Sequence, residues 1–122
     1  MDERITLEQE YAQCNLQLKM IEEEYAEIDA AIKKIESEEE EYEFIYSRTS
    51  GILNELSRYW DDPDFGREID RYEEELFTRK REIQDELEDK KDELFEQRKK
   101  ASCREDEYAE KMAGLRVQME EG

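Results

Sequence analysis

Apolar residues recur along the first half of the chain at alternating steps of four and three positions. Sixteen positions follow this rule, and only Glu39 and Thr49 among them are polar. The series is Leu7, Tyr11, Cys14, Leu18, Ile21, Tyr25, Ile28, Ile32, Ile35, Glu39, Tyr42, Tyr46, Thr49, Leu53, Leu56 and Trp60. An apolar seam of period 3.5 sustained over about seven heptads is typical of a coiled coil. The series predicts one continuous helix over about residues 4–60, in phase across Gly51.

A second, thinner seam follows in the other half of the chain. It comprises Phe65, Ile69, Tyr72, Leu76, Ile83, Leu87, Leu94, Ala101, Tyr108, Met112, Leu115 and Met119. Several of its steps span seven positions, and charged residues such as Arg79, Lys90 and Arg98 lie at or near the vacant places. The pattern predicts a second helix over about residues 65–119. No segment shows the alternation that predicts a strand, so we expect an all-α protein.

The stretch YWDDPDFG, residues 59–66, lies between the two seams and contains the only tryptophan and the only proline of the chain. Proline suits the first position of a helix, because its φ is fixed and its missing N–H costs nothing there. Asp62 can cap that helix, and the neighbouring aspartates favour the positive end of the helix dipole. The stretch therefore predicts a turn over residues 61–64 rather than a functional site.

The charge pattern indicates independently that the two helices fold back on each other, with the reversal near residues 60–61. Acidic residues 22–24 then face basic residues 98–100, basic residues 33–34 face acidic residues 88–89, and acidic residues 38–41 face basic residues 79–81. Each exposed pair is worth about 0–1 kcal/mol, but together they favour one register. We expect one domain over residues 1–122, a long antiparallel two-helix hairpin with its turn near residues 60–65. Pro63 argues against the competing arrangement, an extended parallel homodimer.

Charged residues make up 47% of the chain, and its formal net charge is −19. Such a field repels phosphate backbones and anionic lipids, so we expect no nucleic-acid partner. No apolar run reaches the roughly 20 residues of a membrane-spanning helix, so we expect no membrane insertion. The acidic, polar start MDERITLEQE lacks the pattern of a secretory signal. We therefore expect a cytoplasmic protein, with export alongside a partner as the other option.

The residue types that most catalytic and metal sites need are missing or badly spaced. The chain contains no histidine, the commonest general base and metal ligand, and no glycine-rich loop that could hold a phosphate. The motif DDPD lacks the spacing and the closing glutamate of an EF-hand. Cys14 and Cys103 fit neither a metal pattern nor a disulfide framework, and Cys14 lies at a seam position where a small buried residue is expected. We expect no enzyme, no cofactor and no metal.

Several large apolar residues lie outside both seams: Leu16, Met20, Phe44, Ile45, Ile52, Phe77 and Phe95. Aromatic residues also gather in the half of the hairpin near the turn. Two helices alone cannot cover a second apolar stripe, so we expect a helical partner or a second copy to pack there. The candidate partner-binding residues are Phe44, Ile45, Ile52, Tyr59, Trp60, Phe65, Phe77 and Phe95.

An acidic, histidine-free helical hairpin of this size, with tryptophan at its corner, resembles the WXG-type hairpins of type VII secretion. It is most similar to the small accessory proteins encoded beside LXG toxins, which bind the toxin's helical N-terminal domain and help to deliver it to the secretion machine. Two features depart from the WXG pattern. Trp60 is followed by Asp61 and Asp62 instead of the tryptophan-x-glycine corner, and Tyr108 is followed four residues later by Met112 instead of an acidic residue.

The resemblance implies a targeting or chaperone factor whose partner is the LXG domain, and it implies no catalytic residues. We therefore predict a non-enzymatic interaction protein that binds a helical partner. The alternative is a self-associating coiled-coil rod or spacer, which would form a stable homo-oligomer without any partner.

Overall fold

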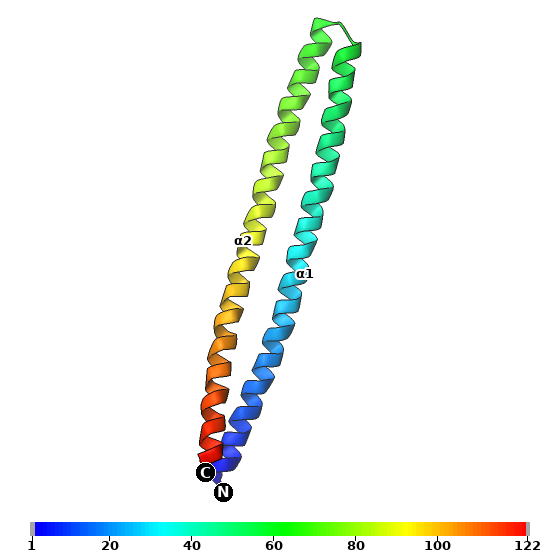
Figure 1. The fold of residues 1–122 in the computed structure, drawn as a ribbon. Helices are drawn as coiled ribbons and strands as arrows, with labels where there is room; N and C mark the ends of the chain where they lie inside the picture. Colours follow the sequence, from blue (N-terminus) through cyan, green and yellow to red (C-terminus); the bar gives the residue numbers. More distant parts are fainter. Residues whose placement is uncertain (1, 122) are drawn as a thin grey trace. The chain divides into compact units, whose positions relative to one another are not determined.

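The computed structural model describes residues 2–121, which form two α-helices joined by a short turn (Figure 1). α1 spans Asp2–Tyr59 and continues through Gly51, and α2 spans Pro63–Glu121. The described residues contain no strand, and the two helices pack against each other, so the predicted all-α hairpin is confirmed. Neither helix contains, within residues 2–121, a segment long and apolar enough to cross a membrane.

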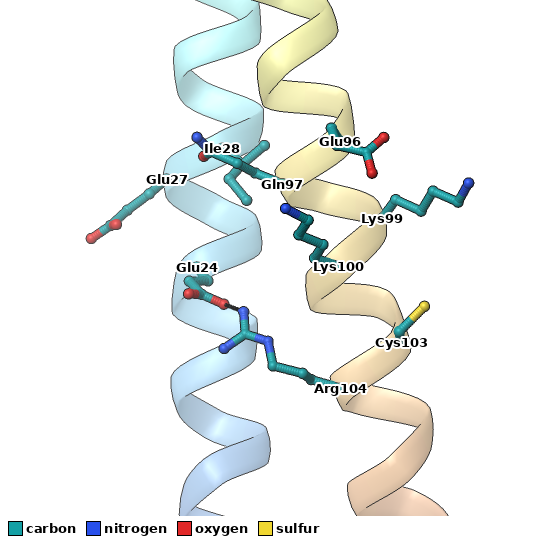
Figure 2. A pocket seen from close by; sticks show the side chains of 9 residues that line it. All are labelled: Glu24, Glu27, Ile28, Glu96, Gln97, Lys99, Lys100, Cys103 and Arg104. Carbon is teal, nitrogen blue, oxygen red and sulfur yellow. Dashed lines mark hydrogen bonds and ion pairs between the residues drawn. The ribbon is translucent and has the colours of Figure 1, made fainter.

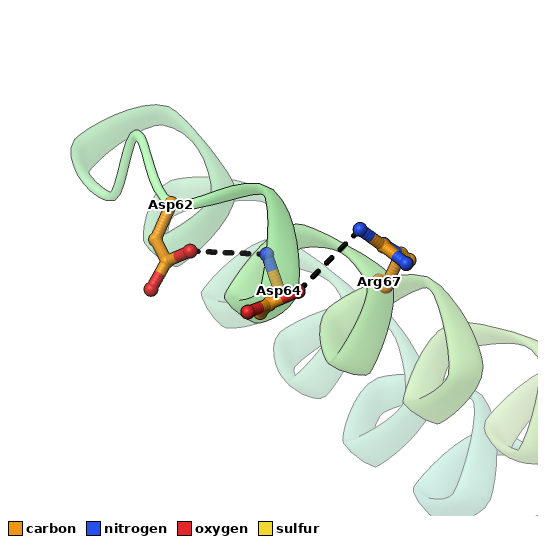
Figure 3. A network of polar contacts seen from close by, with 3 residues as sticks. All are labelled: Asp62, Asp64 and Arg67. Carbon is orange, nitrogen blue, oxygen red and sulfur yellow. Dashed lines mark hydrogen bonds and ion pairs between the residues drawn. The ribbon is translucent and has the colours of Figure 1, made fainter.

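The turn is held by the N-cap of α2, as the sequence predicted. The backbone N–H of Asp64 donates a hydrogen bond of 3.0 Å to Oδ1 of Asp62 (Figure 3). The backbone N–H of Gly66 donates to the carbonyl oxygen of Asp62 at 2.9 Å, which closes the first turn of the helix. Arg67 lies beside this cap, with its Nη2 3.4 Å from Oδ1 of Asp64. An Asp side chain that accepts a bond from an otherwise unpaired N–H is a favourable start for a helix whose first residue is proline.

Close contacts divide the hairpin into two units, and each unit pairs a segment of α1 with a segment of α2. The base unit contains the residues up to Ala31 and those from Glu93 onward, whereas the turn unit spans Ile32–Asp92. The core of the base unit is formed by Cys14, Ile21, Ile28, Ala101 and Leu115. The core of the turn unit is formed by Ile32, Ile35, Ile69 and Leu87. All nine were predicted as seam residues, so the buried stripe of each helix follows the sequence pattern.

Three predicted seam residues are exposed instead. Leu56 and Trp60 are 39% and 57% exposed, because α1 ends beside them and offers fewer neighbours there. Tyr72 is 54% exposed, and the half-buried residue at this level of α2 is Glu73. The prediction was wrong for Tyr72 because it followed apolar residues alone.

The seam of α2 changes phase once, near Ile83. The covered positions of α2 in the turn unit are Phe65, Gly66, Ile69, Glu73, Leu76, Lys80, Ile83, Leu87 and Lys91. From Ile83 to Leu87 to Lys91 two steps of four follow each other, which is a stutter that locally unwinds a coiled coil. Lys80 and Lys91 fill two of the vacant seam positions, so the thin apolar pattern of α2 is completed by long polar side chains.

The ion pairs between the helices do not follow the predicted register. Glu24 pairs with Arg104, and Asp29 pairs with Arg98, so acidic residues 22–24 do not pair with basic residues 98–100. In the turn unit Lys80 pairs with Glu43 and Lys91 with Glu39. The partners in α2 lie further along the chain than predicted, by an amount that differs from pair to pair and is smallest for Glu43–Lys80 and largest for Glu39–Lys91. Side chains tilt toward the N-terminus of their helix, so in an antiparallel pair those of α1 lean away from the turn while those of α2 lean toward it.

We expect Ile32→Ala to lower the free energy of unfolding by about 2–4 kcal/mol, because it removes buried methyl groups from the seam. Ile32 is 7% exposed. The matched control is Leu16→Ala, at a position 51% exposed, which we expect to change stability by no more than about 0.5 kcal/mol. Urea denaturation followed by circular dichroism measures both values. Equal losses in the two variants would contradict the assignment of the seam as the core.

Candidate partner-binding surface

Each helix has two flanks beside its seam, and in an antiparallel pair the g positions of one helix face the g positions of the other. With Tyr42 at position d and Tyr46 at position a, the g positions of α1 fall every seven residues. In the base unit they include Gln17, Glu24 and Ala31, and in the turn unit they are Glu38, Ile45, Ile52 and Tyr59. The same flank therefore changes from polar or small residues to large apolar ones between the two units.

In the base unit the g flank is polar, and an ion pair crosses it. Gln17, Glu24 and Ala31 are half-buried, and Arg104 of α2 reaches across to form an ion pair with Glu24 (Figure 2). Since half of each charged side chain remains exposed, this pair contributes little to stability, but it covers the seam beneath it.

Arginines also cover two tyrosines of the base unit. Nη2 of Arg116 donates a hydrogen bond of 2.7 Å to the hydroxyl of Tyr11, and its guanidinium lies 5.7 Å from the centroid of that ring. The hydrogen bond to Tyr11 raises the pKa of Arg116. Nε of Arg98 lies 3.0 Å from Oδ1 of Asp29, and its guanidinium is 5.2 Å from the ring of Tyr25. Both contacts place a cation over an aromatic face, so little apolar surface is left open at these positions.

A groove of about 670 Å³ lies between the helices of the base unit (Figure 2). The carboxylates of Glu24, Glu27 and Glu96 and the cations Lys99, Lys100 and Arg104 are among the residues that line it. Cys103 is exposed and unpaired, and its thiol points away from α1. No three His, Cys, Asp or Glu residues between positions 2 and 121 come together as a possible metal site. The groove therefore combines carboxylates and cations in its lining.

In the turn unit the g flank of α1 is apolar and open to solvent. Ile45 and Ile52 are each 51% exposed, and Tyr59 is 86% exposed. Leu56 and Trp60 extend this surface toward the turn. We define these five residues as the apolar flank. A stripe of a and d positions suits a helix pair, whereas apolar residues at a, d and g are typical of a helix with further neighbours in a bundle. α1 therefore has, in this unit, the pattern of a helix that lacks one neighbour.

At the turn, the end of the apolar flank is supported by an aromatic contact. The rings of Trp60 and Phe65 lie 5.0 Å apart, centroid to centroid, and are inclined at 39°. Phe65 is half-buried, whereas Trp60 remains more than half exposed. Such an offset aromatic contact is favourable by about 0.5–1.5 kcal/mol beyond the area that it buries. Phe65 thus supports Trp60 rather than forming part of the open surface.

The other candidate residues lie elsewhere. Nζ of Lys80 is 3.3 Å from Oε1 of Glu43 and 4.2 Å from the ring centroid of Tyr46, which defines the opposite side of the seam. Phe77 precedes Lys80 by three residues and lies on that side. Phe44 lies on the outer face of α1, and Phe95 belongs to the base unit. Of the eight predicted residues, Ile45, Ile52, Tyr59 and Trp60 therefore share one surface.

Leu56 is the residue of this surface that sequence reasoning missed. It lies at a d position and was counted as part of the seam, yet it is 39% exposed. The heptad spacing of Ile45, Ile52 and Tyr59 is the signal that could have separated this flank from the scattered apolar residues.

One polar pair lies within the seam of the turn unit. Nζ of Lys91 is 2.7 Å from Oε1 of Glu39, and the two side chains are only 24% and 33% exposed. The hydrogen bond to Glu39 raises the pKa of Lys91 above its usual value of 10.5, with the nearby charges of Glu39, Glu36 and Glu88 adding to the effect. A charged pair at core positions of a coiled coil selects register more than it adds stability, because alternatives leave a charge unpaired.

A family described as "Protein of unknown function (DUF3958)" matches residues 9–113, which include most of both helices. No curated protein and no solved structure matches the chain.

We expect the double substitution Ile45→Gln and Ile52→Gln to leave the helix content of the isolated chain unchanged. Both side chains are half exposed, and glutamine is a good helix former, so unfolding should shift by no more than about 1 kcal/mol. Thermal melts followed by circular dichroism measure this. The comparison is Ile28→Gln with Ile32→Gln, at two buried seam positions. An equally large loss of stability in the flank variant would place Ile45 and Ile52 in the core and contradict their assignment to an open surface.

We expect Lys91→Met to lower the thermal midpoint, because it leaves the carboxylate of Glu39 unpaired in the seam, and Glu39→Leu with Lys91→Met to restore it. The folded-state pKa of Lys91 is raised, so its contribution is fully present below about pH 10.5 and is lost as pH rises through the raised value. The difference between wild type and Lys91→Met should therefore vanish in strong alkali. A difference that persists there, or a double variant no better than the single one, would contradict this role.

Proposed function

Because the chain belongs to the DUF3958 family, whose description names no activity, we propose its function from its own surface. The protein is a non-enzymatic hairpin that binds a helical protein partner along the apolar flank of the turn unit. The observation that supports this most directly is the column of Ile45, Ile52 and Tyr59, spaced by heptads and half or more exposed.

The geometry of the flank suits a helix better than a loop or a small molecule. Its apolar residues follow the axis of α1 over about two heptads, so a second helix can pack along them in the same way as α2 packs on the seam. Trp60 and Tyr59 lie at the end of the column, and these residue types supply much of the binding energy in protein interfaces. A partner helix would complete a three-helix arrangement in the turn unit.

We further propose that the partner is the helical N-terminal domain of an LXG-type toxin of the type VII secretion system. In this role the chain acts as a targeting factor or chaperone of the toxin. The support for this identity is the resemblance to the WXG-like accessory hairpins, which rests on the hairpin, the acidic composition without histidine and the tryptophan at the corner. Partner binding at the flank and the identity of the partner are separate parts of the proposal.

Co-expression with the helical N-terminal domain of an LXG-type toxin tests both parts. With an affinity tag on the LXG domain, we expect the chain to be retained and the two proteins to elute together in size exclusion. We expect Ile45→Gln with Ile52→Gln to weaken this complex at least tenfold, because it removes apolar contacts worth about 1.4 kcal/mol or more.

The matched control is Leu16→Gln with Met20→Gln, at base-unit positions 51% and 52% exposed. It should leave the complex unchanged. Failure of the wild-type chain to bind the LXG domain would contradict the partner's identity. Equal weakening by the two double variants would contradict the flank as the site.

A further inference from the structure

The border of the apolar flank has a large excess of negative charge. On α1 the exposed neighbours of the column are Glu38, Glu41, Arg48 and Glu55. On α2, the g positions that face the flank are Tyr72, Arg79 and Glu86. Next to them, on the solvent side of α2, lie Glu68, Glu75 and Glu82. These positions together contain seven carboxylates and two guanidinium groups.

Ion pairs within α2 use the one guanidinium on that side of the border. Nη1 of Arg79 lies 3.9 Å from Oε2 of Glu82, one of the outer carboxylates. Glu75 also has a neighbour in its own helix, Arg71, whose Nε is 3.7 Å from its Oε1. These exposed contacts are weak, so the border keeps its net negative potential toward anything that packs on the flank.

A second copy of the chain would bring the same carboxylates to the same surface. Like charges placed along both borders of an apolar interface oppose association, and the net charge of −19 adds to this at longer range. A helix with lysine and arginine on either side of its apolar stripe is attracted instead. Its cations face the carboxylates of both borders while its apolar stripe buries the column.

We infer that the apolar flank binds an amphipathic helix of another protein whose apolar stripe is bordered by lysine and arginine. This inference rests on the proposed function and specifies the chemistry of the partner's surface. The basic borders steer the helix onto the flank and fix its orientation, whereas Ile45, Ile52, Leu56, Tyr59 and Trp60 supply the apolar contact. The same flank of the base unit is polar, with Glu24 and Arg104 paired across it and charged residues lining its groove, so it lacks the apolar column.

Trp60 makes the test direct, because it is the only tryptophan of the chain and lies on the flank. Two synthetic helical peptides of about three heptads serve as probes. They share one apolar stripe and contain no tryptophan, and the positions beside the stripe are lysine in one peptide and glutamate in the other. Each is titrated into the full chain while the emission of Trp60 is recorded.

We expect the lysine peptide to shift the emission of Trp60 to shorter wavelength and to bind at least about tenfold more tightly than the glutamate peptide. Raising the salt from about 0.1 M to about 1 M shortens the Debye length from about 10 Å to about 3 Å, so the binding of the lysine peptide should fall about tenfold. Equal binding of the two peptides, or binding that is insensitive to salt, would overturn the inference.

Two double variants that leave the net charge unchanged distinguish specific binding at the flank from general attraction to an acidic chain. Ile45→Gln with Ile52→Gln should abolish the binding of the lysine peptide, whereas Leu16→Gln with Met20→Gln should preserve it. If both double variants bind equally well, the peptide follows charge alone and the inference is wrong. A stable dimer of the isolated chain that the Ile45→Gln and Ile52→Gln variant disrupts would also overturn it, in favour of a second copy.

The two proposals can fail separately. If an LXG domain binds at the flank but the complex is unaffected by salt, the charge inference fails while the proposed function stands. If the lysine peptide behaves as expected and no LXG domain binds, the charge inference stands while the proposed identity of the partner fails.

Discussion

The structure depends on one constraint: a pair of helices can cover only one stripe of each partner. The seam meets this constraint with apolar residues at a and d positions. The buried ones are Cys14, Ile21, Ile28, Ile32 and Ile35 in α1 and Ile69, Leu87, Ala101 and Leu115 in α2. Every apolar residue outside that stripe must be covered by a polar side chain or remain in solvent. In the base unit arginines of α2 cover part of the surface beside the seam, whereas in the turn unit a column of large apolar residues stays open.

Polar residues decide how the two stripes are matched. A seam of isoleucines and leucines tolerates several alignments, because burial is not directional. The Glu39–Lys91 pair and the Lys80–Glu43 pair are directional, and both lie at or beside core positions of the turn unit. They occur next to the phase change of α2, where the apolar pattern alone would specify alignment least well. The same acidic excess that keeps the surface hydrated then gives the open flank a preference among partners.

The fold was predictable because its main determinants are local and repetitive. The 3.5-residue period and the Asp62–Pro63 cap predict both helices and the turn to within a few residues. The phase of α2 was not predictable from apolar residues, since Glu73, Lys80 and Lys91 complete its seam with polar side chains. The ion-pair register was missed because residue numbers do not include the tilt of side chains along each helix. The candidate surface was predicted in part. The exposure of Ile45 and Ile52 follows from the sequence pattern. That Phe77 lies on the other side of the seam follows only from the way in which the two helices pair.

The central claim is that the apolar flank is the surface a partner covers, and hydroxyl-radical footprinting of side chains tests it most directly. The chain is labelled alone and in complex with its helical partner, and the modified residues are identified by mass spectrometry. The account predicts that Ile45, Ile52, Tyr59 and Trp60 are modified in the free chain and protected in the complex, while Leu16 and Met20 react equally in both. Unchanged reactivity of the flank, with protection of the base-unit residues instead, would contradict it.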